Sequence, residues 1–249
     1  VHCFTCGASV PFPVFISNCF GVFDNGEYGE EWLLNNCSVA YIASSWDRLT
    51  PITNETEETK KEIEYIKEEE LDKYRYYHPY MYKRKLTDEI INKFDIGYDK
   101  ERNLMTMPVW DENNNCVMVT GRSVGSKYFH LDADKEKPVY LYNYIKNENI
   151  DKDVYVCESQ INALTLWTWG YHAIAMLGTG TTNQYKTLKE SKVKNFILCF
   201  DGDSAGDKAI TRFKKNINNK FIEVVKIPRN MDVNDLTKEE FDSLSRYNI

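Results

Sequence analysis

The chain has 249 residues, of which 42% are hydrophobic and 14% aromatic, and its formal net charge is -7. This composition excludes a disordered chain and supplies enough apolar residues for the core of one large domain or two small ones. The negative net charge excludes a protein with a wholly basic surface, but it allows a local basic groove. The longest apolar run, Val10 to Ile16, contains two prolines and is too short to span a membrane, and no secretion signal opens the chain, so we expect a cytoplasmic fragment with no membrane partner.

Residues 1–45 predict the end of a small module, because they are rich in Cys and aromatic residues and lack a sustained helical period. Asp24, Asn25 and Gly26 form a turn signal within this segment. Residues 46–73 are strongly charged and offer few apolar contacts, so we expect a solvated helical linker there.

Residues 74–152 predict a mixed subdomain. Thr87 is placed to cap a helix that runs through Lys93 and Phe94, and Gly97 is expected to end it. Two apolar runs, Leu104 to Trp110 and Cys116 to Thr120, predict strands, because the Asp and Asn residues between them favour a turn.

From residue 153 the sequence alternates regularly between short apolar strands and helices. This pattern predicts a parallel sheet covered by helices on both faces, so the fold class is α/β in this region and α+β for the whole chain. Functional side chains in such domains gather beyond the carboxyl ends of the strands. The predicted strands are 154–157, 173–177, 196–200 and 221–227, and the predicted helices are 161–169, 183–191 and 205–217.

Three carboxylates follow two of these strands: Glu158 after the first, and Asp201 and Asp203 after the third. In extended backbone Asp201 and Asp203 point the same way, and Gly202 between them has no side chain to obstruct a ligand. Like charges this close are unfavourable without a cation, and oxygen ligands favour Mg²⁺ or Mn²⁺. A single Asp after a strand more often caps a helix, but three acids at one sheet edge favour a divalent-metal site.

These residues carry a family resemblance. Glu158 together with Asp201-Gly202-Asp203-Ser204-Ala205-Gly206 resembles the TOPRIM domain shared by DnaG-like primases, topoisomerases, some nucleases and recombination mediators. Further segments match the DnaG-like primase core in the same order, from Cys3 to about Leu236. They are His2-Cys3-Phe4-Thr5-Cys6-Gly7, which is similar to the second half of a zinc-binding module, Phe94 to Asp99, Met107-Pro108-Val109 with Asp111, Gly121-Arg122 with Lys127-Tyr128, the phosphate-side loop Leu177-Gly178-Thr179, and Met231-Asp232-Val233-Asn234-Asp235.

The resemblance implies a DNA primase, a DNA-directed RNA polymerase that makes short RNA primers on single-stranded DNA from ribonucleoside triphosphates, with Mg²⁺ or Mn²⁺ as cofactor. It implies a replicative helicase as a further partner, and the cytoplasm or nucleoid of a host cell as the location if the source is viral. The implied site residues are Glu158, Asp201 and Asp203 as catalytic metal ligands, Asp232 and Asp235 as outer metal ligands, and Arg122, Lys127, Tyr128, Gly178 and Thr179 as contacts to nucleic acid or nucleotide.

The same resemblance divides the chain into five expected segments. A truncated zinc-ribbon-like module and a linker precede the basic half of the core and the TOPRIM domain, and a helix closes the chain. Cys3 and Cys6 are half of a four-ligand site, so we expect Zn²⁺ in the complete parent protein and little or none in this fragment. The segments are 1–45 (zinc module), 46–73 (linker), 74–152 (basic subdomain), 153–236 (TOPRIM domain) and 237–249 (C-terminal helix).

One position departs from the family pattern, which has an acidic residue four positions after the glutamate. Asn162 stands there in this chain, and an amide oxygen can bind a metal but contributes no charge. We therefore expect activity to prefer Mn²⁺ or high Mg²⁺.

Three other functions remain open from the sequence. A replisome accessory protein could keep the fold and bind nucleic acid with weak or no catalysis. A TOPRIM nuclease is a second alternative, whereas a topoisomerase would need a further domain with a nucleophilic tyrosine. A phosphatase that uses Asp201 and Asp203 is disfavoured, because that pair normally follows the first strand of its fold.

Overall fold

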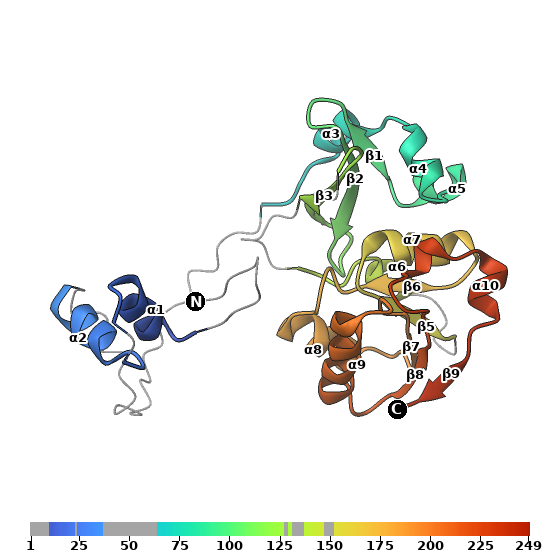
Figure 1. Ribbon diagram of the computed structural model, residues 1–249. Helices are drawn as coiled ribbons and strands as arrows, with labels where there is room; N and C mark the ends of the chain where they lie inside the picture. Colours follow the sequence, from blue (N-terminus) through green and yellow to red (C-terminus); the bar gives the residue numbers. More distant parts are fainter. Residues whose placement is uncertain (1–9, 23, 37–63, 127–128, 131–136, 147–151) are drawn as a thin grey trace. The chain divides into compact units, whose positions relative to one another are not determined.

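The computed structural model describes residues 10–22, 24–36, 64–126, 129–130, 137–146 and 152–249 (Figure 1). The chain divides into two compact units, Val1–Lys60 and Lys61–Ile249. Cys3, Cys6 and residues 46–63 of the expected linker lie outside the described residues. Residues 64–73 were also expected to be solvated linker, but they belong to the second unit, where Leu71 is buried. None of the helices in the described part of the chain is long and apolar enough to span a membrane.

The first unit contains two short helices, α1 (Phe12–Cys19) and α2 (Glu27–Asn36), which pack against each other. The predicted turn between them is confirmed, and the Asp24 carboxylate accepts a hydrogen bond of 3.0 Å from the Gly26 amide. A Cβ on Gly29 would lie 2.0 Å from the carbonyl oxygen of Pro13, so the two helices touch through their backbones. The sequence does not predict these helices, because eight and ten residues are too few to show a helical period.

The second unit begins with an antiparallel sheet and short helices, here called the β1–β4 subdomain (residues 64–130). The sheet has the order β1-β2-β3-β4, and the backbone amide of Ile66 donates to the carbonyl oxygen of Cys116 at the start of β3. The elements are α3 (Glu68–Leu71), the 3-10 helix η2 (Asp72–Tyr74), α4 (Pro79–Lys83), α5 (Asp88–Lys93), β1 (Gly97–Asp99), β2 (Leu104–Trp110), β3 (Cys116–Ser123) and β4 (Phe129–His130).

The predicted cap of α5 and its predicted run to Lys93 are confirmed, but the role predicted for Gly97 is wrong. The Thr87 hydroxyl accepts from the Ile90 amide, as expected of an N-cap. The helix ends at Lys93, and Asp95 adopts the left-handed conformation with φ +54°. Gly97 instead begins β1, where a Cβ would lie 2.1 Å from the carbonyl oxygen of Tyr74. The glycine thus permits a close approach of two backbones rather than a helix end.

Residues 152–249 form the predicted parallel sheet with helices on both faces, here called the α/β domain. Its strand order is β6-β5-β7-β8-β9, with parallel pairing from β6 to β8. A helix before it, α6 (Tyr142–Lys146), is followed by β5 (Val154–Cys157), α7 (Gln160–Thr168), β6 (Ala173–Ala175), α8 (Thr182–Glu190), β7 (Asn195–Leu198), α9 (Ser204–Asn216), β8 (Phe221–Val225), the 3-10 helix η3 (Val233–Asp235), α10 (Lys238–Asp242) and β9 (Arg246–Asn248).

Helices cover both faces of this sheet, with α8 and α9 on one side and α10 on the other (Figure 1). On one face Phe213 of α9 packs edge-on against Phe196 of β7 and Tyr185 of α8. On the other face Phe241 of α10 packs against Tyr155 of β5. Because both faces are covered, the central strands are apolar at nearly every position, as the sequence indicated.

The expected C-terminal helix covers only part of residues 237–249. After α10 the chain turns and adds β9 antiparallel to β8, with Tyr247 opposite Val224. The open edge of β8 offers backbone hydrogen bonds to residues 246–248 that a longer helix would forgo.

Candidate active site

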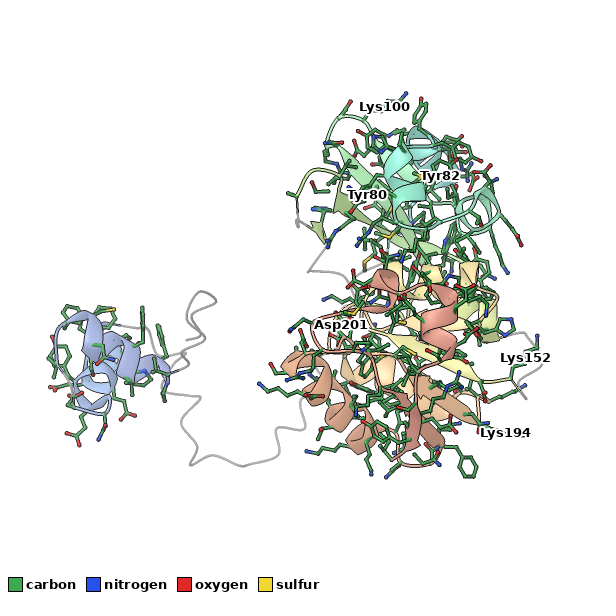
Figure 2. The ribbon with its side chains drawn as sticks, turned by 45° about the vertical axis from the view of Figure 1, so that its right-hand side comes forward. Tyr80, Tyr82, Lys100, Lys152, Lys194 and Asp201 are labelled. Carbon is green, nitrogen blue, oxygen red and sulfur yellow. The ribbon has the colours of Figure 1, made fainter. Side chains whose placement is uncertain are left out.

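The acidic residues meet at one edge of the α/β domain because three neighbouring strands end there. Glu158 follows β5, Asp201 follows β7, and Asp232 lies in the segment that follows β8. Strands β5, β7 and β8 are adjacent and parallel, so their carboxyl ends lie side by side. Figure 2 shows Asp201 far from Lys152 and Lys194, which precede β5 and β7 at the opposite end of the sheet.

Glu158 has a strongly perturbed carboxyl group. Burial, and then the negative charge of Asp201, raise its pKa to about 7. Among the described residues its Oε1 is buried and has no hydrogen-bond partner. A buried carboxylate oxygen without a donor is a position that a cation can fill.

The charged form of the Asp201 carboxyl group is also disfavoured. Burial, followed by the charges of Asp232 and Asp203, raises its pKa to about 6. One hydrogen bond acts in the opposite direction, since the Asn162 amide donates to Asp201 Oδ1 at 3.2 Å. Glu158 and Asp201 therefore repel each other in the metal-free chain.

The other three predicted ligands are tied to local backbone. Asp203 caps α9 through Oδ1, which accepts from the amides of Ala205 and Gly206 at 2.8 Å each. Asp232 and Asp235 form a reciprocal capping box at η3. Burial, and then Asp235, raise the pKa of Asp232. Asp203 thus has the helix-capping role that is common for a lone aspartate. Capping uses only its Oδ1, so among the described residues its Oδ2 remains open to another partner.

In the described part of the chain, no three His, Cys, Asp or Glu side chains are gathered into a ready set of metal ligands. The donor chemistry nevertheless fits a hard divalent cation, because carboxylate oxygens converge at one edge and Glu158 keeps an unpartnered oxygen.

The predicted phosphate-side loop lies beside Glu158. The Gly178 amide donates to the carbonyl oxygen of Glu158 at 3.1 Å, and Gly178 has φ +110°. Arg212 of α9 donates to Thr179 Oγ1 at 3.1 Å. Arg212 carries no signal of its own in the sequence, where only its place two turns into the helix after Asp203 indicates a role at this edge.

Arg122 extends from β3 on the side that faces the α/β domain. Side chains two residues apart in a strand share a face, and Thr120 on that face is joined to Gln160 by a buried hydrogen bond of 2.7 Å. Gln160 is two residues after Glu158, and Arg122 Nε is buried without a partner among the described residues. Lys127 and Tyr128, the other predicted basic-groove residues, lie outside the described residues.

The raised pKa values predict how stability depends on pH. Each acid holds its proton more tightly in the folded chain than in the unfolded chain. Without metal, the free energy of unfolding therefore falls as the pH rises. Glu158 contributes to this fall between pH 4.5 and about 7, and Asp201 between pH 3.8 and about 6. Glu158→Gln removes one of these charges. Near pH 4 we expect the variant and the unaltered chain to melt at the same temperature. At pH 7.5 we expect the variant to melt roughly 2–4 °C higher, which is the shift that a gain of about 1 kcal/mol in unfolding free energy produces in a chain of this size.

Thermal melts in chelator, followed by circular dichroism at both pH values, measure this difference. Equal melting temperatures at pH 7.5 would mean that the Glu158 charge is not destabilising. Added Mg²⁺ is expected to stabilise the unaltered chain more at pH 7.5 than at pH 5, because protons compete for the same oxygens.

Comparison with known proteins gives one family and many relatives. Residues 155–237 match the Toprim-like family. The DNA primase of Campylobacter jejuni is 26% identical over 265 residues, covering 85% of this chain and 42% of its own length. That of Haemophilus influenzae is 30% identical over 128 residues, covering 48% of this chain and 22% of its own length. The chain therefore spans less than half the length of these curated relatives.

Solved structures agree in fold. The Aquifex aeolicus primase, with zinc-binding and RNA polymerase domains, has a TM-score of 0.58 at 18% identity, covering 99% of this chain and 73% of its own. A DnaG primase catalytic domain bound to single-stranded DNA has a TM-score of 0.55 at 21% identity, covering 65% of this chain and 67% of its own. The expected TOPRIM-type fold, together with the resemblance to DnaG-like primases, is confirmed by these findings.

Proposed function

We propose that this chain synthesises short RNA primers on single-stranded DNA during replication. The premise is its relationship to the DnaG-like DNA primases, whose TOPRIM domain it carries. The observation that supports this most is the convergence of Glu158, Asp201 and Asp232 at one sheet edge, with their pKa values raised, beside the loop at Gly178. Such an edge is suited to hold divalent cations against a triphosphate.

The acidic residues would hold the metal. Glu158 and Asp201 are the central ligands in this proposal, Asp203 contributes Oδ2, and Asp232 and Asp235 form the outer part of the cluster. Two bound Mg²⁺ or Mn²⁺ ions would activate a ribonucleotide 3′-hydroxyl and neutralise the departing pyrophosphate. The unpartnered Oε1 of Glu158 is the position that a cation would satisfy first.

The positively charged residues would hold nucleic acid and nucleotide. Arg122 can grip two phosphate oxygens. The Thr179 hydroxyl accepts from Arg212 and keeps its own hydrogen for a phosphate, and Gly178 leaves open space beside Glu158 because nothing in the described part of the chain lies within 4 Å of where its Cβ would be. Lys127 and Tyr128 are assigned to the same groove from the family resemblance. The exposed rings of Tyr77 and Tyr82 in the β1–β4 subdomain are available for stacking template bases, whereas Tyr80 packs against the core.

The partners and the second metal are proposed from relatives. A related primase domain was solved with single-stranded DNA, and a phage T7 primase fragment with a TM-score of 0.51 comes from a primase-helicase protein. We propose a single-stranded DNA template, ribonucleoside triphosphates and a replicative helicase as partners, in the cytoplasm or nucleoid. Zn²⁺ is proposed for the parent protein at a site that includes Cys3 and Cys6.

A primer-synthesis assay tests the proposal. Labelled ribonucleotides are incubated with a mixed single-stranded DNA template and Mg²⁺ or Mn²⁺, with this chain and with a form extended upstream to complete the zinc module. Short RNA products that require template support the primase. Template binding without products would favour the accessory protein, and template cleavage would favour the TOPRIM nuclease.

The residue at position 162 is expected to influence the Mg²⁺ concentration that activity requires. Asn162→Asp replaces the amide that donates to Asp201 with a carboxylate, which restores the acid expected of the family. We expect the Mg²⁺ concentration for half-maximal activity to fall severalfold, because added ligand charge strengthens cation binding. Without metal the variant should melt at a lower temperature than the unaltered chain, because the two carboxylates repel. An unchanged Mg²⁺ titration would contradict this role.

A further inference from the structure

A line of hydrogen bonds runs from the β1–β4 subdomain to the acidic edge. It begins just after α4, at Lys85, whose backbone has φ +65°. The Lys85 ammonium donates to the carbonyl oxygens of Asn234 and Leu236 at 2.5 Å and 2.7 Å. These two carbonyls flank the end of η3, which directly follows Asp232.

Asn234 continues the line inside the protein. Its side chain is buried, and Nδ2 donates at 2.9 Å both to the carbonyl oxygen of Arg84 and to Thr165 Oγ1. Its backbone amide donates to Asn162 Oδ1 at 3.2 Å. Both side-chain hydrogens and the backbone amide of Asn234 are therefore engaged, so this residue has one well-defined orientation.

Asn162 completes the line at the site. It is 1% exposed, and it uses both ends of its amide, accepting from Asn234 and donating to Asp201. An ionised carboxylate could accept the first bond but could not donate the second, so an acid at this position would strengthen the site only through its charge and would disconnect Asp201 from Asn234. The orientation of the Asp201 carboxylate thus depends, through two buried asparagines, on where Arg84 and Lys85 lie.

We propose that Lys85, Asn234 and Asn162 form a positioning relay, in which docking of the β1–β4 subdomain on the α/β domain orients Asp201 for cation binding. This inference rests on the proposed function, because it takes Asp201 as a metal ligand. The relay makes the metal affinity of the acidic edge depend on a lysine of the other subdomain. Lys85 is a positioning residue, since its ammonium bonds to the backbone carbonyls of Asn234 and Leu236 and acts on Asp201 only through Asn234 and Asn162.

Direct Mn²⁺ binding to the full chain tests the relay without requiring activity. Electron paramagnetic resonance of free Mn²⁺ gives the dissociation constant for the unaltered chain, Lys85→Met and Thr165→Val. The first variant removes the ammonium, and the second removes the oxygen that receives one Asn234 hydrogen while keeping the side-chain shape. Lys83→Met is the matched control, because Lys83 is exposed and lies two residues away at the end of α4.

We expect Lys85→Met and Thr165→Val each to weaken Mn²⁺ binding by about tenfold, the lower end of the effect of removing groups that orient metal ligands. Lys83→Met should bind like the unaltered chain. Binding that is equal in all four proteins would overturn the relay and leave the metal site standing. No Mn²⁺ binding by the unaltered chain would overturn the metal site and the relay with it. If Lys85→Met does not fold by circular dichroism, Thr165→Val decides.

Discussion

Asp201→Asn is expected to lower the rate of RNA-primer synthesis by at least about a hundredfold. The substitution keeps the oxygen that accepts the Asn162 hydrogen bond and removes only the charge that would hold a cation. Loss of several kcal/mol of metal-borne stabilisation of the transition state corresponds to a factor of about 10² or more in rate. The metal-free variant should also melt at a higher temperature than the unaltered chain at pH 7.5, because a destabilising charge has gone.

Asp153→Asn is the matched control for this experiment. Asp153 is exposed, precedes β5 at the opposite end of the sheet, and accepts a hydrogen bond from Asn195. The control should keep full activity and an unchanged Mn²⁺ affinity. Primer synthesis by Asp201→Asn within a factor of three of the unaltered chain would remove Asp201 from the catalytic site.

Gly202→Ala is expected to disrupt both stability and the acidic edge. A Cβ at Gly202 would lie 2.0 Å from the carbonyl oxygen of Pro228, a backbone atom that no side-chain rotation can move. The Gly202 amide donates to the carbonyl oxygen of Met231, and its own carbonyl accepts from the Asn230 amide, both at 2.9 Å. The added methyl group would therefore push apart the segments that carry Asp201 and Asp232.

We expect Gly202→Ala to cost about 1–3 kcal/mol of unfolding free energy, the usual cost of overpacking, and to reduce Mn²⁺ affinity and primer synthesis together. Gly125→Ala is the control, because a Cβ there would meet nothing within 4 Å. Urea unfolding and Mn²⁺ titration of both variants measure the effect. Native stability and affinity in Gly202→Ala would show that the turn at residues 228–231 can yield without cost.

This glycine shows what local sequence could and could not predict. From the sequence, Gly202 keeps space free for a ligand between two aspartates. In the structure, the space beside it is occupied by the backbone of Pro228, and contacts between residues so far apart in the chain leave no local signal. The acidic edge itself was predictable, because strands that are apolar at every position identify a parallel sheet, and the carboxyl ends of parallel strands meet.

The α/β domain was predicted better than the rest for the same physical reason. Its strands and helices alternate in short, strongly patterned segments, and Gly170 follows α7 with φ +88°, as the helix end predicted there requires. In contrast, α1 and α2 have no repeated period to detect. Gly97 was wrongly predicted to end α5, because Asp95 adopts the left-handed conformation after the helix, a conformation more often found at glycine or asparagine.

Residues such as Asn234 and Lys85 could not be assigned a role from the sequence alone. Each is an ordinary polar residue in its own segment, and its role depends on partners brought close only by the fold. Asn162 stood out only through the family pattern. The sequence could not indicate that its amide joins Asp201 to Asn234.

The contacts between Lys85 and residues 234–236 also affect the order in which the chain can fold during synthesis. Lys85 and Asn234 are 149 residues apart, so their hydrogen bond closes a loop of more than half the chain. The β1–β4 sheet is built from neighbouring segments and can form as soon as they leave the ribosome. The acidic edge can acquire its final orientation only when residues 234–236 have been made, so the metal site is completed well after the β1–β4 sheet has been translated.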